Sequence, residues 1–404
     1  MADERQQEDV GVTMRCNSFL SQTERNAVIE LRHAMHREPE LSNAEWKTQA
    51  RIRDMLRRFG LADVKVFHNT GLYIDIEGTA SGPKRSIAVR GDIDALPIGE
   101  TRRDLSYCST VEGVMHACGH DIHASIALGT VLAFHRLRGN FAGRLRVFFQ
   151  PAEEAEPLGG RTVEAERLLE GFDRAVGFHV NPEIPAGVFD AREGAITKSA
   201  DQFKLIISGK MAHGAAPHQG VDAIAIAAAF INEVQKVVSR EMPADDGAII
   251  TIGTIHGGNA TNIICPSVAI EGTIRTGSPE RRAQLCQRVR EVAEGVAVMH
   301  RGRADFNVSA GEPAVVNDPQ MVRRFRQVVH ETVGYEGVTS ETRAAGSDDF
   351  GFYSASVPSI YFWVGSRSCG NESHLHTPTF GASDDIIIPA TELAVRYILA
   401  LLNS

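Results

Sequence analysis

The sequence lacks an excess of basic residues. Its 42 lysines and arginines are outnumbered by 51 aspartates and glutamates, which leaves a net charge of −9. Because proteins bind nucleic acids through a basic face, this balance argues against a nucleic-acid partner. A local arginine can still override the average, so an anionic small-molecule substrate is not excluded.

Long apolar runs and a disulfide pattern are also missing. The sequence has no apolar run of about 18 residues, and its first 20 residues are charged and polar. We therefore expect no membrane span and no signal peptide, and we expect a loose tail at residues 1–10. The six cysteines, at 16, 108, 118, 265, 286 and 369, show no tight pairing pattern. This usage favours a reduced, cytoplasmic protein.

The chain is long enough for two domains, with 404 residues of which 43% are apolar. The first 195 residues alternate between helical and strand patterns. Helices are expected at 23–37, 43–59 and 121–138, and strands at 64–67, 72–77, 86–89 and 143–149. This alternation predicts an α/β fold with a central mixed sheet flanked by helices.

The pattern changes near residue 199. Six elements follow in the order β-α-β-β-α-β, at 202–208, 221–240, 248–256, 267–276, 279–300 and 304–309. This order is typical of a ferredoxin-like unit. We predict an inserted domain at 196–310, which divides a discontinuous first domain of residues 1–195 and 311–404.

The octet 116–123 (HACGHDIH) contains three imidazoles, a thiol and a carboxylate. Thiolate and imidazole are ligands that suit zinc and its first-row neighbours. In an extended segment, alternation would place Cys118 and His120 on one side. A loop with a few packed histidines is the alternative, but the octet as a whole favours a metal site.

Further polar clusters occur where strands are expected to end. The site candidates in them are Asp92, Asp94, Glu153, Glu154, His179 and His376. Each cluster alone could be a solvated loop. In extended geometry the two glutamates would point in opposite directions, so one could bind metal while the other faces a substrate. Together the clusters predict one site at the carboxyl edge of the sheet.

These motifs resemble the hippurate hydrolase and auxin-conjugate amidohydrolase group of the metal-dependent aminoacylase and carboxypeptidase G superfamily. The resemblance runs from the segment 36–41 (HREPEL) to 376–380 (HTPTF). It includes 346–350 (GSDDF), which is close to the usual Gly-Ser-Glu-Asp-Phe of the group. Several separated motifs in the right order make the resemblance specific.

Residue by residue, the resemblance implies two divalent metal ions per subunit. Cys118 matches the bridging ligand, Glu153 matches the general base, and the remaining ligands match His120, His179, Glu154 and His376. Asp92 stands where the wider superfamily has a ligand histidine, and His120 is expected to supply that imidazole. Asp92 and Asp94 are then expected to orient ligands, and whether either touches a metal stays open. Manganese or zinc is expected, with cobalt and nickel as alternatives.

The implied chemistry is amide hydrolysis. Two cations about 3.5–4 Å apart can hold a bridging water and lower its pKa. Glu153 would take the proton, the hydroxide would attack the amide carbonyl, and Glu153 would return the proton to the departing amine. The predicted substrate is an N-acyl amino acid, including aromatic ones.

Two alternatives stay open. The same centre could deaminate an activated aromatic amine. The segments 361–363 (YFW) and 368–373 suggest this hypothesis. The protein could also be a catalytically inactive sensor or scaffold.

The resemblance implies that the inserted domain at 196–310 is a lid and dimerisation domain, and that residues 1–195 and 311–404 form the metal-binding catalytic domain. The inserted domain carries three further candidates. His213 matches a lid histidine that stabilises the tetrahedral oxyanion, although a histidine in such a loop is by default a surface residue. Asn262 and Arg275 match lid positions that receive a substrate carboxylate, which a guanidinium can bind with two hydrogen bonds; otherwise Arg275 ends an edge strand in solvent. Because related enzymes pair through the lid, we expect a homodimer or higher homo-oligomer acting on a small carboxylate-bearing molecule.

Overall fold

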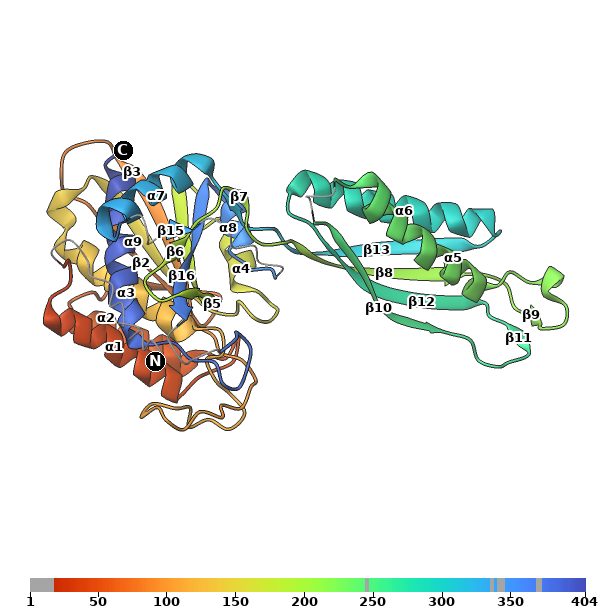
Figure 1. The fold of residues 1–404 in the computed structure, drawn as a ribbon, viewed down its shortest axis with the longest axis horizontal. Helices are drawn as coiled ribbons and strands as arrows, with labels where there is room; N and C mark the ends of the chain where they lie inside the picture. Colours follow the sequence, from red (N-terminus) through yellow and green to blue (C-terminus); the bar gives the residue numbers. More distant parts are fainter. Residues whose placement is uncertain (1–17, 244–246, 335–337, 340–345, 368–372) are drawn as a thin grey trace, which may run out of the picture. The chain divides into compact units, whose positions relative to one another are not determined.

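The computed structural model describes residues 18–243, 247–334, 338–339, 346–367 and 373–404 (Figure 1). The chain forms two compact units: unit 1 comprises residues 1–194, 317–342 and 352–404, and unit 2 comprises residues 195–316 and 343–351. The expected tail at 1–10, the segment 368–372 and the cysteines at 16 and 369 lie outside the described residues. No helix within the described ranges combines the length and apolarity needed to cross a membrane.

In the described part of unit 1, eight strands form one sheet in the order β1-β2-β4-β3-β5-β16-β6-β15. Neighbours pair in parallel between β3 and β4, β3 and β5, β5 and β16, and β6 and β15, and the other pairs are antiparallel. The predicted mixed sheet is therefore confirmed. The strands are β1 (Val64–Phe67), β2 (Gly71–Glu77), β3 (Arg85–Asp92), β4 (Gly143–Gln150), β5 (Arg174–Pro185), β6 (Phe189–Asp190), β15 (Val338–Thr339) and β16 (Ser359–Arg367).

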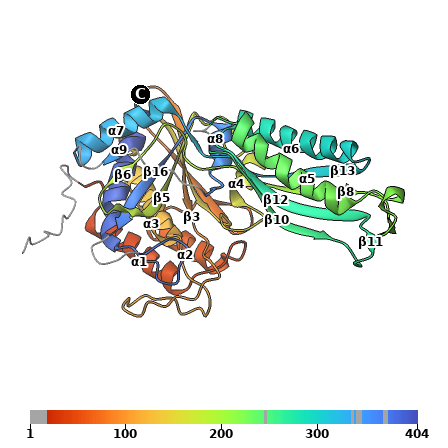
Figure 2. The same cartoon turned by 45° about the vertical axis from the view of Figure 1, so that its right-hand side comes forward.

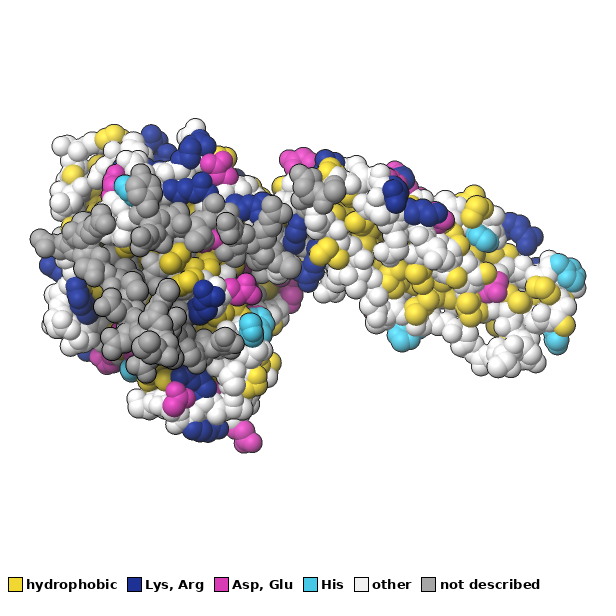
Figure 3. Space-filling model, in the orientation of Figure 1, with side chains coloured by type: hydrophobic (Ala, Val, Ile, Leu, Met, Phe, Trp, Pro, Cys, Tyr) yellow, Lys and Arg dark blue, Asp and Glu magenta, His cyan; other side chains and the backbone are white. Residues whose placement is uncertain are grey.

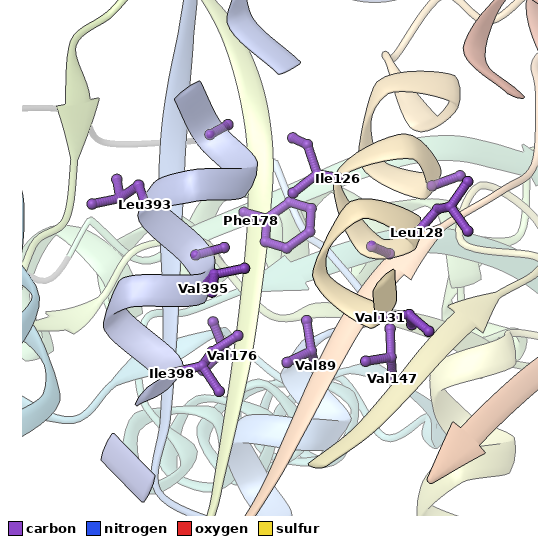
Figure 4. Close-up of a cluster of buried hydrophobic side chains, with 14 of the residues drawn as sticks. Val89, Ile126, Leu128, Val131, Val147, Val176, Phe178, Leu393, Val395 and Ile398 are labelled. Atoms are coloured by element: carbon purple, nitrogen blue, oxygen red, sulfur yellow. The ribbon is translucent and has the colours of Figure 1, made fainter. Parts of the chain in front are cut away.

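Helices flank this sheet because its strands are apolar on both faces. Figure 4 shows α3 and α9 packing on one face, where Phe178 of β5 lies between Ile126 of α3 and Val395 of α9. The helices of unit 1 are α1 (Gln22–Arg37), α2 (Trp46–Arg58), α3 (His120–Arg136), α4 (Gly159–Ala165), α7 (Pro319–Thr332), α8 (Gly351–Ser356) and α9 (Ile387–Leu402), with short 3₁₀ turns at Arg138–Asn140 and Asp384–Ile386.

Helix α1 begins at Gln22, one residue before its predicted start. The Ser21 hydroxyl accepts from the Glu24 backbone N–H, and the Glu24 side chain accepts from the Ser21 backbone, which is a capping box. Helix α2 instead begins three residues later than predicted, because Asn43 has a left-handed backbone with φ of 67°. Residues 43–45 therefore form a connection between the two helices rather than a helical turn.

Unit 2 has its own sheet and its own core. The strands follow the order β10-β12-β8-β13, all pairs being antiparallel, and α5 and α6 cover one face of this sheet (Figures 1 and 2). The main elements in chain order are β8 (Ala200–Ser208), α5 (Ala223–Lys236), β10 (Ile249–Gly257), β12 (Ser267–Arg275), α6 (Pro279–Met299) and β13 (Arg303–Glu312). Their order along the chain is β-α-β-β-α-β.

Smaller elements complete unit 2 and its links to unit 1. A two-stranded sheet joins β9 (Ala212–His213) and β11 (Ile263–Ile264), a 3₁₀ turn lies at Pro217–Gln219, and a π-helical turn at Val237–Glu241 follows α5. Strands β7 (Gly194–Ala195) and β14 (Val316–Asn317) pair where the chain passes between the units.

Candidate metal centre

The candidate centre lies where the parallel strands of unit 1 end. Asp92, the last residue of β3, is opposite Gln150, the last residue of β4. Val89 of β3 is opposite Val176 of β5, so three residues further along both strands His179 is level with Asp92. His179 was predicted at the end of a strand and instead lies inside β5, because β5 runs on past the end of its neighbour. The register still brings it to the carboxyl edge of β3.

Cys118 and His120 reach the same edge from a turn. The predicted extended segment is wrong here: Cys118 lies in a bend, and His120 is the first residue of α3. Gly119 between them has φ of 86°, and a Cβ there would come within 2.4 Å of Val180 Cγ2, so glycine is required. The backbone N–H of His376 donates to the carbonyl of Ala117, the residue before Cys118, at 2.8 Å. This contact brings the C-terminal loop to the turn.

The first group of donor atoms comprises Cys118, His120 and His179, which are buried and lie within 4.8 Å of one another. The Sγ of Cys118 is 3.3 Å from His179 Nε2. His179 Nδ1 donates to the Val180 carbonyl at 2.7 Å. In the neutral ring Nε2 then carries the lone pair that can bind a metal ion. His120 Nδ1 pairs with Asp94 Oδ1 at 3.0 Å, and its buried Nε2 has no hydrogen-bond partner among the described residues. Both imidazoles thus have the arrangement of metal ligands.

The second group shares the same thiol. Cys118, Glu154 and His376 offer donor atoms within 4.8 Å of one another. His376 Nε2 lies 3.2 Å from the Sγ of Cys118 and 3.0 Å from Glu154 Oε1. The side chain of His376 is 51% exposed, whereas every member of the first group is buried. The second group is therefore the more open of the two.

The electrostatic environment of the site favours a bound cation. Burial raises the pKa of the Cys118 thiol well above its usual range, and nearby carboxylates raise it further, namely those of Glu154, Glu153 and Asp92. Burial lowers the pKa of His120, but three carboxylates outweigh it and raise that pKa to about 10, namely those of Asp92, Asp94 and Glu154. A thiol among carboxylates ionises only when a cation compensates it.

The donor types fit such a cation. Burial, together with His123 and His120, lowers the pKa of His179 well below its usual range, so this imidazole is neutral and able to ligate. Thiolate, imidazole and carboxylate donors suit zinc, and carboxylate donors also suit manganese. The residues present at this edge therefore fit a pair of divalent ions.

Asp94 connects three parts of the centre. Its Oδ1 pairs with His120 Nδ1, and its Oδ2 accepts from the backbone N–H groups of Glu153 and Glu154 at 3.0 Å each. The hydroxyl of Ser42 donates to the same oxygen at 2.7 Å. Burial opposes its ionisation, but these hydrogen bonds hold the pKa of Asp94 below its usual value. With both oxygens engaged, Asp94 is placed to orient ligands rather than to bind metal.

Asp92 is engaged in a similar way. Its Oδ1 lies 2.6 Å from His123 Nδ1, and its Oδ2 lies 2.6 Å from Arg90 Nη1 and 3.6 Å from His120 Nε2. Burial opposes ionisation, but Arg90 and the imidazoles lower the pKa of Asp92 well below its usual range. His123 Nε2 accepts from the Val180 backbone N–H at 2.9 Å. Both nitrogens of His123 are thus engaged, which argues against a third metal group of Asp92, His120 and His123.

Glu153 and Glu154 point to the same side, contrary to the prediction. The chain turns at Ala152, whose φ is 51°, and the next residues form a bend instead of an extended segment. One carboxylate oxygen of each glutamate lies within 4.8 Å of the other and of a His120 ring nitrogen. A base and a ligand can therefore face the centre together.

Two further residues near the centre are buried. Glu45 differs from its prediction, whereas His116 was expected to support the centre or to pack. Glu45, expected within a helix, is fully buried and accepts from the backbone N–H of Ala152 at 2.9 Å. No local pattern marks it, since its partner is 107 residues away. His116 is buried, and burial lowers its pKa to about 4. Its ring nitrogens have no hydrogen-bond partner in the described part of the chain, so it packs as a neutral side chain.

The site candidates of unit 2 do not gather in one place. His213 ends β9 and is exposed, as is Asn262 just before β11. These two lie close together, since the backbone N–H of Gly214 donates to the Asn262 carbonyl at 2.7 Å. Arg275 is half-buried at the last residue of β12, whereas β11 precedes the first residue of that strand. Arg275 therefore lies at the opposite end of β12 from the other two.

The chain is similar to known proteins over nearly its whole length. The sequence model of peptidase family M20/M25/M40 matches residues 88–400. An uncharacterized hydrolase of Sinorhizobium fredii is 70% identical over 387 residues, 96% of each chain. The N-acetylcysteine deacetylase of Bacillus subtilis is 33% identical over 379 residues, 93% of this chain and 97% of that protein. A solved dinuclear metal-binding peptidase of the M20 family from Bacillus subtilis matches with a TM-score of 0.81 and 29% identity, over 95% of this chain and 99% of that chain.

Proposed function

The chain belongs to peptidase family M20/M25/M40, which confirms the resemblance seen in its motifs, and on that premise we propose that it hydrolyses the amide bond of an N-acyl amino acid. The observation that carries the proposal is the Cys118 thiol shared by two groups of donor atoms. The Bacillus subtilis relatives support it, since one is named as a deacetylase of N-acetylcysteine and the other as a dinuclear metal-binding peptidase.

We assign Cys118, His120 and His179 to one ion, and Cys118, Glu154 and His376 to the other. Manganese or zinc is proposed, with cobalt and nickel as alternatives. When bound, such ions lower the pKa of a water molecule and polarise the amide carbonyl. Asp94 holds His120 in the tautomer that leaves Nε2 for the ion, and it holds the backbone of both glutamates. Asp92, paired with Arg90, lies 3.6 Å from His120 Nε2, the nitrogen assigned to the ion.

Glu153 is proposed as the general base and acid. One oxygen of its carboxylate lies within 4.8 Å of a Glu154 carboxylate oxygen and of a His120 ring nitrogen, and we assign it to neither ion. It takes a proton from the attacking water and returns it to the nitrogen of the departing amine, which is otherwise a very poor leaving group. His213 is proposed to stabilise the oxyanion that forms on the carbonyl oxygen, and Asn262 and Arg275 to receive the substrate carboxylate.

The positions of these residues in unit 2 favour a homo-oligomer. Strand β12 has nine residues, which span roughly 26 Å. That is longer than a small N-acyl amino acid, so His213 and Arg275 of one chain cannot both contact one substrate. We therefore propose that unit 2 supplies at least one of them to the site of a second subunit.

The edge of the unit 2 sheet offers a surface for such pairing. Strand β10 is an edge strand, and its residues Ile249 and Ile255 are exposed; Figure 3 shows hydrophobic side chains on the surface of this unit. An unpaired edge can accept the same edge of a second copy. Light scattering should give a dimer or larger oligomer for the wild type and a smaller species for Ile255→Lys. A monomeric wild type would reject this part of the proposal.

The other two functions are less well supported. Tyr361 and Trp363 are buried, with the Trp363 ring edge-on to His179 at 5.8 Å, so little aromatic surface is open to an amino-aromatic substrate. The segment 368–372 lies outside the described residues. A non-enzymatic role leaves the presence of Glu153 beside two donor groups unexplained.

One screen separates the three functions. Metal-free protein is reconstituted with manganese, zinc, cobalt or nickel and incubated with N-acetyl and N-benzoyl amino acids and with amino-aromatic acids. Release of free amino acid is expected, and only with metal. Release of ammonia from the amino-aromatic acids would favour deamination instead. No turnover with any ion would leave the inactive scaffold as the better interpretation.

A further inference from the structure

The connection between α1 and α2 lies against the segment that carries the two glutamates. The Ser42 hydroxyl donates to Asp94 Oδ2 at 2.7 Å, and Asn43 Nδ2 donates to the Ala155 carbonyl at 3.2 Å. The connection itself is fixed, since the Ala95 backbone N–H donates to the carbonyl of Glu40 at 2.8 Å. This connection holds none of the proposed ligands, yet it contacts the segment of the two glutamates directly at Ala155 and indirectly through Asp94.

Glu45 makes the central contact of this connection. Its side chain is fully buried, with Oε1 accepting from the Ala152 backbone N–H at 2.9 Å and Oε2 accepting from the Thr70 hydroxyl at 2.7 Å. Ala152 has φ of 51°, a left-handed conformation that residues other than glycine rarely adopt. A hydrogen bond to its N–H therefore helps to hold a turn that the residue alone disfavours.

Three consecutive backbone N–H groups follow one pattern. Ala152 donates to Glu45, and Glu153 and Glu154 both donate to Asp94 Oδ2. Two carboxylates from separate parts of the sequence, Glu45 and Asp94, are buried here. Together they accept hydrogen bonds from all three backbone N–H groups of the turn. Because Glu153 and Glu154 share this backbone, a shift at Ala152 would move the base and the ligand together.

We propose that Glu45 is a positioning residue for the reaction. Through the N–H of Ala152 it fixes the turn that directs Glu153 toward the reacting atoms and Glu154 toward the metal centre. The inference rests on the proposed function for the identity of the base and the ligand, but the contact itself does not depend on it.

The chemistry of the Glu45 site predicts which substitutions should preserve its two hydrogen bonds. Burial and the nearby Asp94 raise the pKa of Glu45 to about 7, so the site also accommodates a neutral side chain. Glutamine keeps an oxygen for the Ala152 N–H and turns its amide toward Thr70 Oγ1. Aspartate keeps the charge but is one methylene shorter, so it cannot make both contacts.

The test compares Glu45→Asp, Glu45→Gln and a control, Glu40→Ala, in holoenzyme. Glu40 is half-buried in the same connection, but its Oε2 accepts from the Thr48 backbone N–H at 2.7 Å and so supports α2 instead. Glu45→Asp should lower kcat by about 10–100-fold with little change in KM. It should also weaken the affinity for one ion by about 10–100-fold in competition with a chelator. Glu45→Gln should stay close to wild type in both.

The control should lower the Tm while leaving kcat and metal affinity unchanged. The proposal is wrong if Glu45→Asp, like the control, leaves kcat and metal affinity unchanged. It is also wrong if Glu45→Gln lowers kcat and metal affinity as much as Glu45→Asp does. A wild type that binds no metal and hydrolyses no amide would reject the proposed function itself, whereas an active wild type with an unimpaired Glu45→Asp rejects the positioning role alone. Should Glu45→Asp fail to fold, Glu45→Met takes its place, because it fills a similar volume without a carboxyl oxygen for the Ala152 N–H, and an unchanged kcat would then reject the role.

Discussion

The candidate residues of unit 1 and those of unit 2 are held in different ways. In unit 1 the members of the first donor group are buried, and hydrogen bonds orient the two imidazoles among them, as Asp94 does for His120. In unit 2 His213 and Asn262 are exposed, and Arg275 lies at the far end of β12. We infer from this difference that the proposed reactive groups are organised within unit 1, whereas the candidate residues of unit 2 are placed to make separate contacts with a substrate.

The largest expected effect concerns the acid–base residue of unit 1. Glu153→Gln should lower kcat by about 10²–10⁴-fold because it removes the proton acceptor. Metal content, measured by elemental analysis, should stay at the wild-type level, since Glu153 is not assigned as a ligand. As a control, Glu156 is an exposed glutamate of the same segment, and Glu156→Gln should keep the wild-type kcat and metal content. A near-normal rate for Glu153→Gln would remove it from the mechanism.

Within unit 1, the buried and the open donor groups should respond differently. His179→Ala and His376→Ala should each release one ion and lose turnover with it. His179 is buried and His376 is 51% exposed, so only His179→Ala should also lower the free energy of unfolding of the metal-free protein, by about 1–3 kcal/mol. Equal losses of unfolding free energy in urea titrations would contradict this distinction.

The contacts of unit 2 should act independently of each other. His213→Ala should lower kcat by about 10²-fold, as expected when one oxyanion donor is lost. Arg275→Ala should raise KM by about 10–100-fold, through loss of a charge-assisted hydrogen bond. Because the two residues lie at opposite ends of β12, the effects on kcat/KM should multiply in the double variant. Strong non-additivity in steady-state kinetics would mean that they share one contact.

A smaller effect concerns the buried network beside the centre. His36 Nδ1 lies 2.9 Å from Asp121 Oδ2 and its Nε2 lies 3.3 Å from Glu100 Oε1. Burial lowers the pKa of His36, but these two carboxylates outweigh it and raise that pKa from 6.5 to about 9. The folded state therefore holds this proton more tightly than the unfolded state. The resulting stabilisation is complete below about pH 6.5 and is lost as the pH rises through about 9.

The matching experiment is urea unfolding of the wild type and of His36→Gln across this pH range. The difference in unfolding free energy should be largest near pH 6 and should shrink toward pH 10. A difference that stays constant over this range would show that His36 stabilises the fold by packing alone.

The sequence predicted the sheet and the donor residues, because both leave local signals. Apolar alternation marks β3 and β4, and thiol, imidazole and carboxylate groups at strand ends indicate a metal site. The position of His179 inside β5 depends on how far one strand extends past another. The shared direction of Glu153 and Glu154 depends on the backbone of Ala152. Such features are imposed by partners far away in sequence, and Glu45 is the clearest case.

The most direct test of a shared thiol is the metal stoichiometry of Cys118→Ser, with the affinity for each ion measured by chelator competition. Because the Sγ lies 3.3 Å from His179 Nε2 and 3.2 Å from His376 Nε2, the substitution should weaken both ions at once. The cobalt-loaded wild type should also show a thiolate charge-transfer absorption that the variant lacks. A variant that binds two ions with wild-type affinity would contradict the shared-thiol centre.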